Sequence, residues 1–235
     1  MISERAFAES YKSFWMENTP FLSEYCSLPE ARGRRFAREI TIPEVGYHVS
    51  LNNIVATTHF RNITGDPDYI VDQSYRDSNQ VLGIFSPNYA KQYKLTDNYR
   101  KIIIIQAERL ASQYCGPMIH DPEFPGYGLM GKCRGDLIIG NVLVEIKANT
   151  GKRYNKPFEN KDFRQLIVYC ALNHLAGNPH KIEKLNLFNP RMGFLWQSDI
   201  EGFIYRISGA TSIELFNSIG NYLLSLTGGF ADADY

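Results

Sequence analysis

Asp136, Glu145 and Lys147 lie close together in the sequence and are of the types that act on phosphate groups. Carboxylate oxygens are the ligands that a hard divalent cation such as Mg²⁺ prefers in proteins. A cation held by the two acids, with an ammonium group beside it, suits the attack of water on a phosphate. The residue types therefore indicate metal-assisted hydrolysis, provided that the fold brings the acids together.

A predicted β-hairpin does bring them together. Gly140-Asn141 separates two short apolar runs, and this dipeptide is typical of a two-residue hairpin turn. Closing the hairpin there places Asp136 opposite Glu145, and like charges so placed are destabilising unless a cation compensates them. Because side chains alternate across a strand, Lys147 shares the face of both acids. The opposite face is apolar and is predicted to be core: Val142, Val144 and Ile146.

A second pair of polar residues lies downstream, on a helix predicted to begin at Asn160 or Asp162. Gln165 and Tyr169 are four positions apart, so they lie on the same side of this helix, next to its apolar stripe. One interpretation makes both part of the site. The other makes Gln165 the capping-box partner of Asp162 and Tyr169 an ordinary half-buried tyrosine. With the acids and the lysine upstream, the site interpretation is preferred.

These residues together resemble a known family. Asp136 followed by Glu145-Ile146-Lys147 resembles the D…(D/E)-x-K motif of the PD-(D/E)xK nuclease superfamily. Gln165 to Tyr169 is similar to the Q-x-x-x-Y motif of its RecB/Cas4-like branch, and the resemblance covers roughly residues 97 to 207. Gly135 stands where the family usually has proline. The resemblance implies an α/β, restriction-endonuclease-like fold, in which a mixed β-sheet core is flanked by helices.

The same resemblance implies a function and a role for each residue. It implies a nuclease that depends on Mg²⁺ or Mn²⁺ and acts on nucleic acid, DNA before RNA. Asp136 and Glu145 are expected to hold the metal. Lys147 is expected to orient or deprotonate the attacking water and to stabilise charge on the phosphate oxygens. Gln165 and Tyr169 are expected to position either the substrate backbone or the lysine.

Further candidates surround these residues. A helix predicted over 96–114 carries Glu108, which has no basic residue three or four positions away. The resemblance makes Glu108 a third metal ligand, the alternative being a surface glutamate paired with a distant lysine. His120 is a candidate neighbour of the metal by the same resemblance, or a loop histidine without a fixed role. Extending the hairpin register predicts Arg134 opposite Lys147.

Composition indicates a folded globular protein. The chain has 235 residues, of which 44% are hydrophobic, and disordered chains are poorer in such residues. No run approaches the roughly 20 apolar residues of a membrane span, and the first residues lack the apolar region of a secretory signal. We therefore expect a cytoplasmic protein with no membrane partner.

Charge is balanced over the chain but not locally. Lysine plus arginine and aspartate plus glutamate number 25 each, which by itself does not favour a nucleic-acid partner. Basic residues nevertheless cluster around the predicted site, where they could attract phosphates or simply form a solvated loop. This basic cluster consists of Lys147, Lys152, Arg153, Lys156, Lys161 and Arg164. The four cysteines show no C-x-x-C spacing, so reduced thiols are expected rather than the iron–sulfur cluster of some relatives.

The chain is predicted to have two parts, an N-terminal α+β lobe of unassigned role over 1–95 and the nuclease-like core over 96–235. The predicted helices span 2–16, 96–114 and 211–226, besides the one that carries Gln165. The predicted strands outside the hairpin lie between 36 and 60 and over 185–188, 192–196 and 203–207.

The sequence and its resemblance thus predict a metal-dependent nuclease, which analogy of fold places in a defence, repair or mobile-element system. A protein partner that guards or targets it, or a homo-oligomer, is expected. Two alternatives stay open. One is a nuclease-fold module without turnover that binds nucleic acid or a protein. The other is a globular protein in which Lys147 neutralises Asp136 and Glu145 on a surface hairpin.

Overall fold

A computed structural model describes residues 1–36, 116–147, 156–189 and 192–228 of the chain. The helix predicted over 96–114, the strands predicted between 36 and 60, and the boundary predicted near residue 95 lie outside the described residues. Cys115 lies outside them as well, whereas Cys26, Cys133 and Cys170 are buried free thiols.

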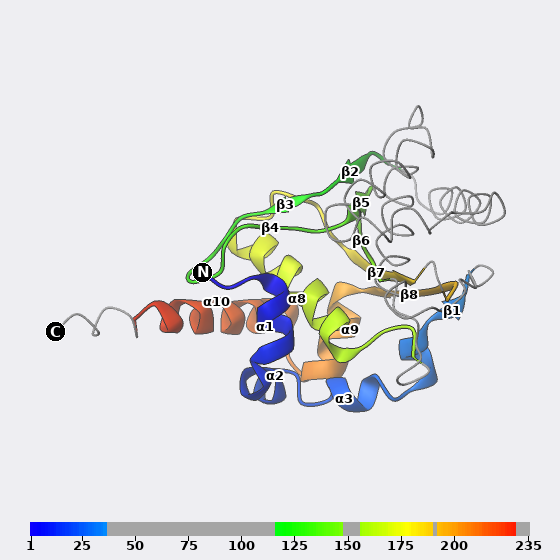
Figure 1. The fold of residues 1–235 in the computed structure, drawn as a ribbon, viewed down its shortest axis with the longest axis horizontal. Coiled ribbons are helices and arrows are strands. Elements are labelled where there is room, and N and C mark those ends of the chain that lie inside the picture. The colour runs from blue at the N-terminus through cyan, green and yellow to red at the C-terminus, as the bar shows by residue number, and fades with distance from the viewer. Residues whose placement is uncertain (37–115, 148–155, 190–191, 229–235) are drawn as a thin grey trace, which may run out of the picture.

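The described residues form a mixed sheet flanked by helices, as predicted (Figure 1). Six strands lie in the order β1-β8-β7-β6-β5-β2. Only the β6–β7 pair is parallel among the described strands, and the others are antiparallel. The strands are β1 (Arg34–Arg35), β2 (Met118–His120), β5 (Leu137–Ile139), β6 (Val142–Ile146), β7 (Lys184–Asn189) and β8 (Phe194–Asp199). A separate two-stranded sheet joins β3 (Glu123–Phe124) to β4 (Cys133–Arg134).

The predicted hairpin and its register are confirmed. β5 and β6 pair with Leu137 opposite Val144 and Ile139 opposite Val142, around the turn at Gly140-Asn141. Gly140 has φ 60°, a left-handed conformation that glycine adopts without a steric penalty. The strands predicted over 185–188 and 192–196 correspond to β7 and β8.

One predicted strand is a helix. Residues 203–207 lie in α9 (Ile200–Ser208), because Asp199 is an N-cap whose Oδ1 accepts a hydrogen bond from Gly202 N at 2.6 Å. The left-handed Gly209 ends the helix. A short apolar run fits a strand or a helix equally well, and the cap at Asp199 decides between them.

The N-terminal helix predicted over 2–16 is divided at Tyr11, whose ψ of 59° lies outside the helical range. The resulting elements are α1 (Glu4–Ser10) and α2 (Lys12–Asn18), followed by α3 (Leu22–Tyr25) and a 3₁₀ turn, η1 (Pro29–Arg32). Three aromatic side chains of α1 and α2 are buried: Phe7, Phe14 and Trp15. They join the same hydrophobic core as the sheet and α8 (Asn160–Leu175), so residues 1–36 pack as part of the body that carries the site.

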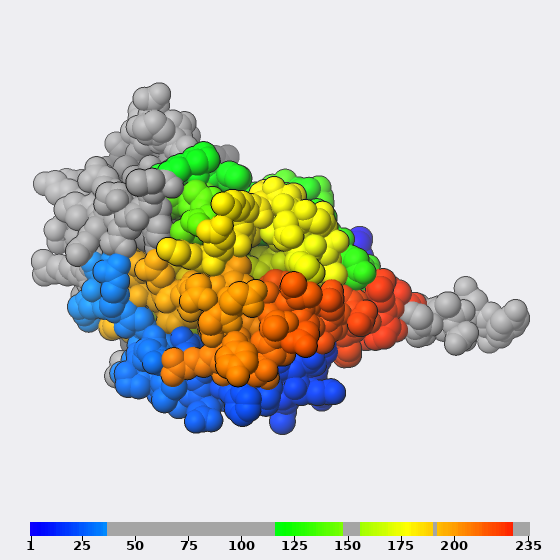
Figure 2. Space-filling model, turned by 180° about the vertical axis from the view of Figure 1, so that it is seen from behind, coloured from blue at the N-terminus to red at the C-terminus, as the bar shows by residue number. Residues whose placement is uncertain are grey.

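The closing helix, predicted over 211–226, is α10 (Ser212–Gly228) and packs along α8. Seen from behind, α9 and α10 form one continuous surface with the N-terminal residues (Figure 2). Within the described ranges, no helix combines the length and the hydropathy that crossing a membrane requires.

The two faces of the hairpin enter different hydrophobic clusters. Ile138 and Leu143 belong to the large cluster around α8, on the side where Figure 1 shows α1, α8, α9 and α10. The alternate positions form a second cluster with Phe36, Phe188 and Leu195, which confirms that this face is core: Leu137, Ile139, Val142, Val144 and Ile146. Glu145 therefore faces α8.

Candidate active site

Asp136 and Glu145 lie side by side at the open end of the hairpin. The β5–β6 ladder ends at the pair Leu137 and Val144, and the two acids are the next residues on each strand. Asp136 Oδ2 accepts a hydrogen bond from Ile146 N at 2.7 Å, so its side chain reaches across to β6. The negative charge of Asp136 contributes to a raised pKa at Glu145. The predicted juxtaposition of the two carboxylates is therefore present.

Glu145 is buried with one oxygen unsatisfied. The residue is 4% exposed, and its Oε1 accepts from Lys147 Nζ at 2.8 Å. Its Oε2 is buried without a hydrogen-bond partner. Burial, followed by the repulsion from Asp136, raises the pKa of Glu145 to about 8. An unsatisfied carboxylate oxygen in this position is costly unless a cation or a proton occupies it.

Lys147 lies between Glu145 and α8. Its Nζ donates to Gln165 Oε1 at 2.6 Å as well as to Glu145. Burial alone lowers the pKa of Lys147, but the charges of Glu145, Asp162 and Asp136 outweigh it and leave the pKa above its ordinary value. With its pKa raised, the Lys147 side chain is an ammonium ion, and it donates to Glu145 Oε1 and Gln165 Oε1.

Gln165 links Lys147 to Tyr169. Its Nε2 donates to the Tyr169 hydroxyl at 2.7 Å, and that hydroxyl donates to the carbonyl oxygen of Arg134 at 3.1 Å. Tyr169 is only 1% exposed, so it is a fully buried residue rather than the half-buried tyrosine of the alternative interpretation. The chain of hydrogen bonds runs from Glu145 through Lys147, Gln165 and Tyr169 to the backbone.

The capping interpretation of Gln165 is wrong. Helix α8 begins one turn earlier than that interpretation requires, with Glu159 as its N-cap and Asp162 at the third helical position. Asp162 Oδ2 accepts from Glu159 N at 2.8 Å, so Asp162 fills the place that the interpretation gave to Gln165. Gln165 is therefore available to bind Lys147.

Phe124 supports this hydrogen-bonded chain and was not predicted. Its ring stacks on Tyr169, with centroids 5.0 Å apart and planes at 21°. A Cβ atom at Gly135 would lie 3.1 Å from Phe124 Cε2, and Gly135 N donates to Pro122 O at 3.0 Å. Proline at this position would crowd the ring and lose the donor, which gives a physical reason for glycine there. Phe124 and Tyr169 are far apart in the sequence. The sequence signal related to their contact is Gly135, which stands where the family usually has proline.

Arg134 and His120 do not lie where the sequence placed them. Instead of extending the hairpin opposite Lys147, Arg134 belongs to β4, opposite Glu123, and its Nη2 lies 3.6 Å from Glu123 Oε2. His120 pairs with Leu137 on β2. Since Leu137 alternates with Asp136, the register places His120 on the face of the sheet opposite the acids.

Two neighbouring carboxylates among the described residues are candidate metal ligands. Asp136 and the unsatisfied oxygen of Glu145 are hard oxygen donors on one face of the hairpin, which suits Mg²⁺ or Mn²⁺. The described part of the chain contains no cluster of three or more histidine, cysteine, aspartate or glutamate residues arranged for a metal. Glu108, the third ligand expected, lies outside the described residues.

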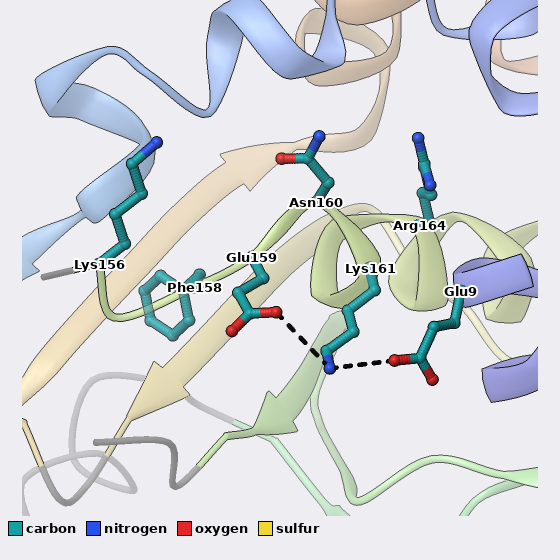
Figure 3. A pocket seen from close by; sticks show the side chains of 7 residues that line it. All are labelled: Glu9, Lys156, Phe158, Glu159, Asn160, Lys161 and Arg164. Atoms are coloured by element: carbon teal, nitrogen blue, oxygen red, sulfur yellow. Dashed lines mark hydrogen bonds and ion pairs between the residues drawn. The ribbon is translucent and has the colours of Figure 1, made fainter. Parts of the chain in front are cut away.

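The basic cluster is described only in part. Lys152 and Arg153 lie outside the described residues, whereas Lys156, Lys161 and Arg164 line a pocket at the start of α8 (Figure 3). Glu9 of α1 lines the same pocket.

The salt bridge between Lys147 and Glu145 agrees with the alternative in which the lysine neutralises the acids. Glu145 is buried against α8, however, and Lys147 is partly buried, so the pair does not lie on an exposed hairpin. Comparisons with protein-family models, with curated proteins and with solved structures found no match to this chain.

Proposed function

We propose that this chain is a metal-dependent nuclease of the PD-(D/E)xK type, which hydrolyses phosphodiester bonds in nucleic acid. The observation that carries the proposal is the unsatisfied Oε2 of Glu145, buried beside Asp136 and beside an ammonium group. The hairpin with Asp136 and Glu145 precedes the helix with Gln165 and Tyr169 in the chain. This order supports a restriction-endonuclease-like core. DNA is the substrate that the sequence resemblance favours.

Asp136 and Glu145 would hold the metal ion, which when bound supplies a Lewis acid for the phosphate and lowers the pKa of water. Because Glu145 is buried, its side chain is restricted and the hairpin sets the position of its carboxylate oxygens. The hydrogen bond from Ile146 N fixes the carboxylate of Asp136 in the same way.

Lys147 would stabilise the negative charge that develops on the phosphate oxygens. Its raised pKa favours this electrostatic role over proton abstraction, because an ammonium ion has no lone pair to accept a proton. Gln165 and Tyr169 would position Lys147 rather than contact the substrate, since both bury their polar atoms in the chain of hydrogen bonds.

A cleavage assay tests the proposal. Purified protein is incubated with duplex and single-stranded DNA and with RNA, in Mg²⁺, in Mn²⁺ or in EDTA. We expect cleavage only with a divalent cation, and Asp136→Asn and Lys147→Ala should each lower its rate by about 100-fold or more. Lys181→Ala, which removes an exposed cation paired with Glu183, is the control and should leave the rate unchanged. Full cleavage by both site variants would remove the assignment, and binding without cleavage by the unaltered protein would favour a module without turnover.

A further inference from the structure

A second feature that could contact nucleic acid is the pocket at the start of α8. It has a volume of about 490 Å³ and is partly open to solvent. Figure 3 shows the side chains that line it: Glu9, Lys156, Phe158, Glu159, Asn160, Lys161 and Arg164. Three of these residues are cations, and two are carboxylates.

Lys156 and Arg164 form no salt bridge with a described residue. Lys156 Nζ donates to the carbonyl oxygen of Cys26 at 2.9 Å, and Arg164 Nη1 donates to that of Ala8 at 3.3 Å. Both acceptors are neutral. Each cation has further N–H donors, and Arg164 Nε is buried without a hydrogen-bond partner. Asn160 extends to the same side of the helix in Figure 3 and donates to Ser23 Oγ at 3.0 Å.

Lys161 is held by both carboxylates of the pocket. Its Nζ lies 3.3 Å from Glu9 Oε1 and 3.5 Å from Glu159 Oε2. These side chains are between a third and a half exposed, and ion pairs of that exposure and length are weak in water. A backbone phosphate, which carries one negative charge and two accessible acceptor oxygens, can therefore compete with these carboxylates for Lys161.

Helix α8 connects this pocket to the candidate active site. Lys161 precedes Gln165 by one helical turn on the same side of α8, a rise of about 6 Å. Gln165 binds Lys147 directly. An anion at Lys161 would thus lie on the stripe of the helix that reaches the catalytic lysine.

We infer that this pocket binds a backbone phosphate of the nucleic acid, at a nucleotide that flanks the scissile bond. The inference rests on the proposed function for its choice of substrate. Lys156 and Arg164, which extend to one side of the start of α8 in Figure 3, supply charge and donors, and Lys161, which extends to the other side, adds charge. The carboxylate of Glu9 competes with the phosphate for Lys161, so the N-terminal helix weakens binding at this point.

Binding of a fluorescent oligonucleotide, measured in EDTA over a series of salt concentrations, tests the inference. Loss of one phosphate contact lowers the dependence of log K on log salt by about 0.9 for duplex DNA and about 0.7 for a single strand. Lys156→Gln and Lys161→Gln should each weaken binding and lower the slope by this amount. Glu9→Gln should tighten binding. Lys181→Gln is the matched control and should change neither quantity, because Lys181 is exposed and follows the C-terminal end of α8, whereas the pocket lies at its start.

Arg164 also lies over the ring of Trp15, so its substitution could disturb the core, and the test uses the two lysines instead. Unchanged affinity and slope in both lysine variants would contradict phosphate binding in the pocket. The nuclease assignment would then still depend on its own cleavage assay. Reduced slopes in the lysine variants of a protein that cleaves no substrate would support phosphate binding in the pocket and contradict the nuclease assignment. Absence of oligonucleotide binding by the unaltered protein would overturn the pocket.

Discussion

Lys147 Nζ lies 2.6 Å from Gln165 Oε1, although the two residues are 18 positions apart in the chain. This contact joins the hairpin that carries the acids to the helix that covers it. It gives Gln165 and Tyr169 a common role, which is to hold the ammonium group beside Glu145.

Tyr169→Phe should lower activity more than its effect on stability explains. The substitution keeps the stacking on Phe124 but removes the hydroxyl between Gln165 and the Arg134 carbonyl. Two buried polar groups lose a partner, which costs on the order of 1 to 3 kcal/mol of unfolding free energy. Because Gln165 is then less fixed, Lys147 is less well positioned and the turnover rate should fall. Urea denaturation and the cleavage assay measure the two effects.

Tyr25→Phe is the matched control for that substitution. It removes another buried tyrosine hydroxyl, which accepts a hydrogen bond from Trp196 Nε1 at 2.8 Å. We expect a comparable loss of stability with no loss of turnover. Equal losses of turnover in both variants would mean that Tyr169 acts only through the stability of the fold.

Glu145→Gln should change how stability depends on pH. In the unfolded chain Glu145 titrates near 4.5, and burial and Asp136 raise its pKa to about 8 in the folded protein. Between these values the folded state binds more protons than the unfolded state, so the contribution of Glu145 to stability falls as pH rises. The glutamine variant cannot lose a proton, and its stability relative to the unaltered protein should therefore increase from pH 5 to pH 8 in metal-free buffer.

Thermal or urea denaturation at several pH values measures this difference. Glu183→Gln provides the comparison, because Glu183 is exposed and its pKa is lowered by Lys181. A constant difference in stability between the Glu145 variant and the unaltered protein across this pH range would show that Glu145 titrates as an ordinary glutamate.

Gly135→Pro, which restores the residue that the D…(D/E)-x-K family usually has, should destabilise this protein. The ring would crowd Phe124, and the hydrogen bond from Gly135 N to Pro122 O would be lost. Crowding of a packed side chain costs about 1 to 3 kcal/mol. Gly135→Ala should cost less because it keeps the donor. Denaturant midpoints that rank proline as the milder change would contradict the proposed packing.

The site was predictable where local rules determine it. Gly140-Asn141 sets the register of the hairpin, and the register places Asp136 beside Glu145 without knowledge of any distant residue. The i, i+4 spacing likewise paired Gln165 with Tyr169. The contact of Phe124 with Tyr169 follows from how the β3–β4 sheet packs on α8, and no spacing in the sequence encodes it.

The wrong predictions concern features that depend on contacts between distant parts of the chain. Extension of the hairpin register predicted Arg134 opposite Lys147, but Arg134 pairs with Glu123 of β3, and no local pattern in the sequence selects that partner. Residues 203–207 fit two periodicities, and Asp199 as an N-cap selects the helix. Burial of Glu145 against α8 was not predicted either, because alternation shows which face a residue occupies but not what covers it.

A crystal soaked in Mn²⁺ tests the central claim most directly, since anomalous scattering locates the ion without reference to activity. We predict a peak within coordination distance of Asp136 and of Glu145 Oε2, about 2.0 to 2.3 Å from the nearest oxygens, and its loss in the Asp136→Asn variant. An anomalous map with no peak between these carboxylates, at Mn²⁺ concentrations that support cleavage, would contradict the account.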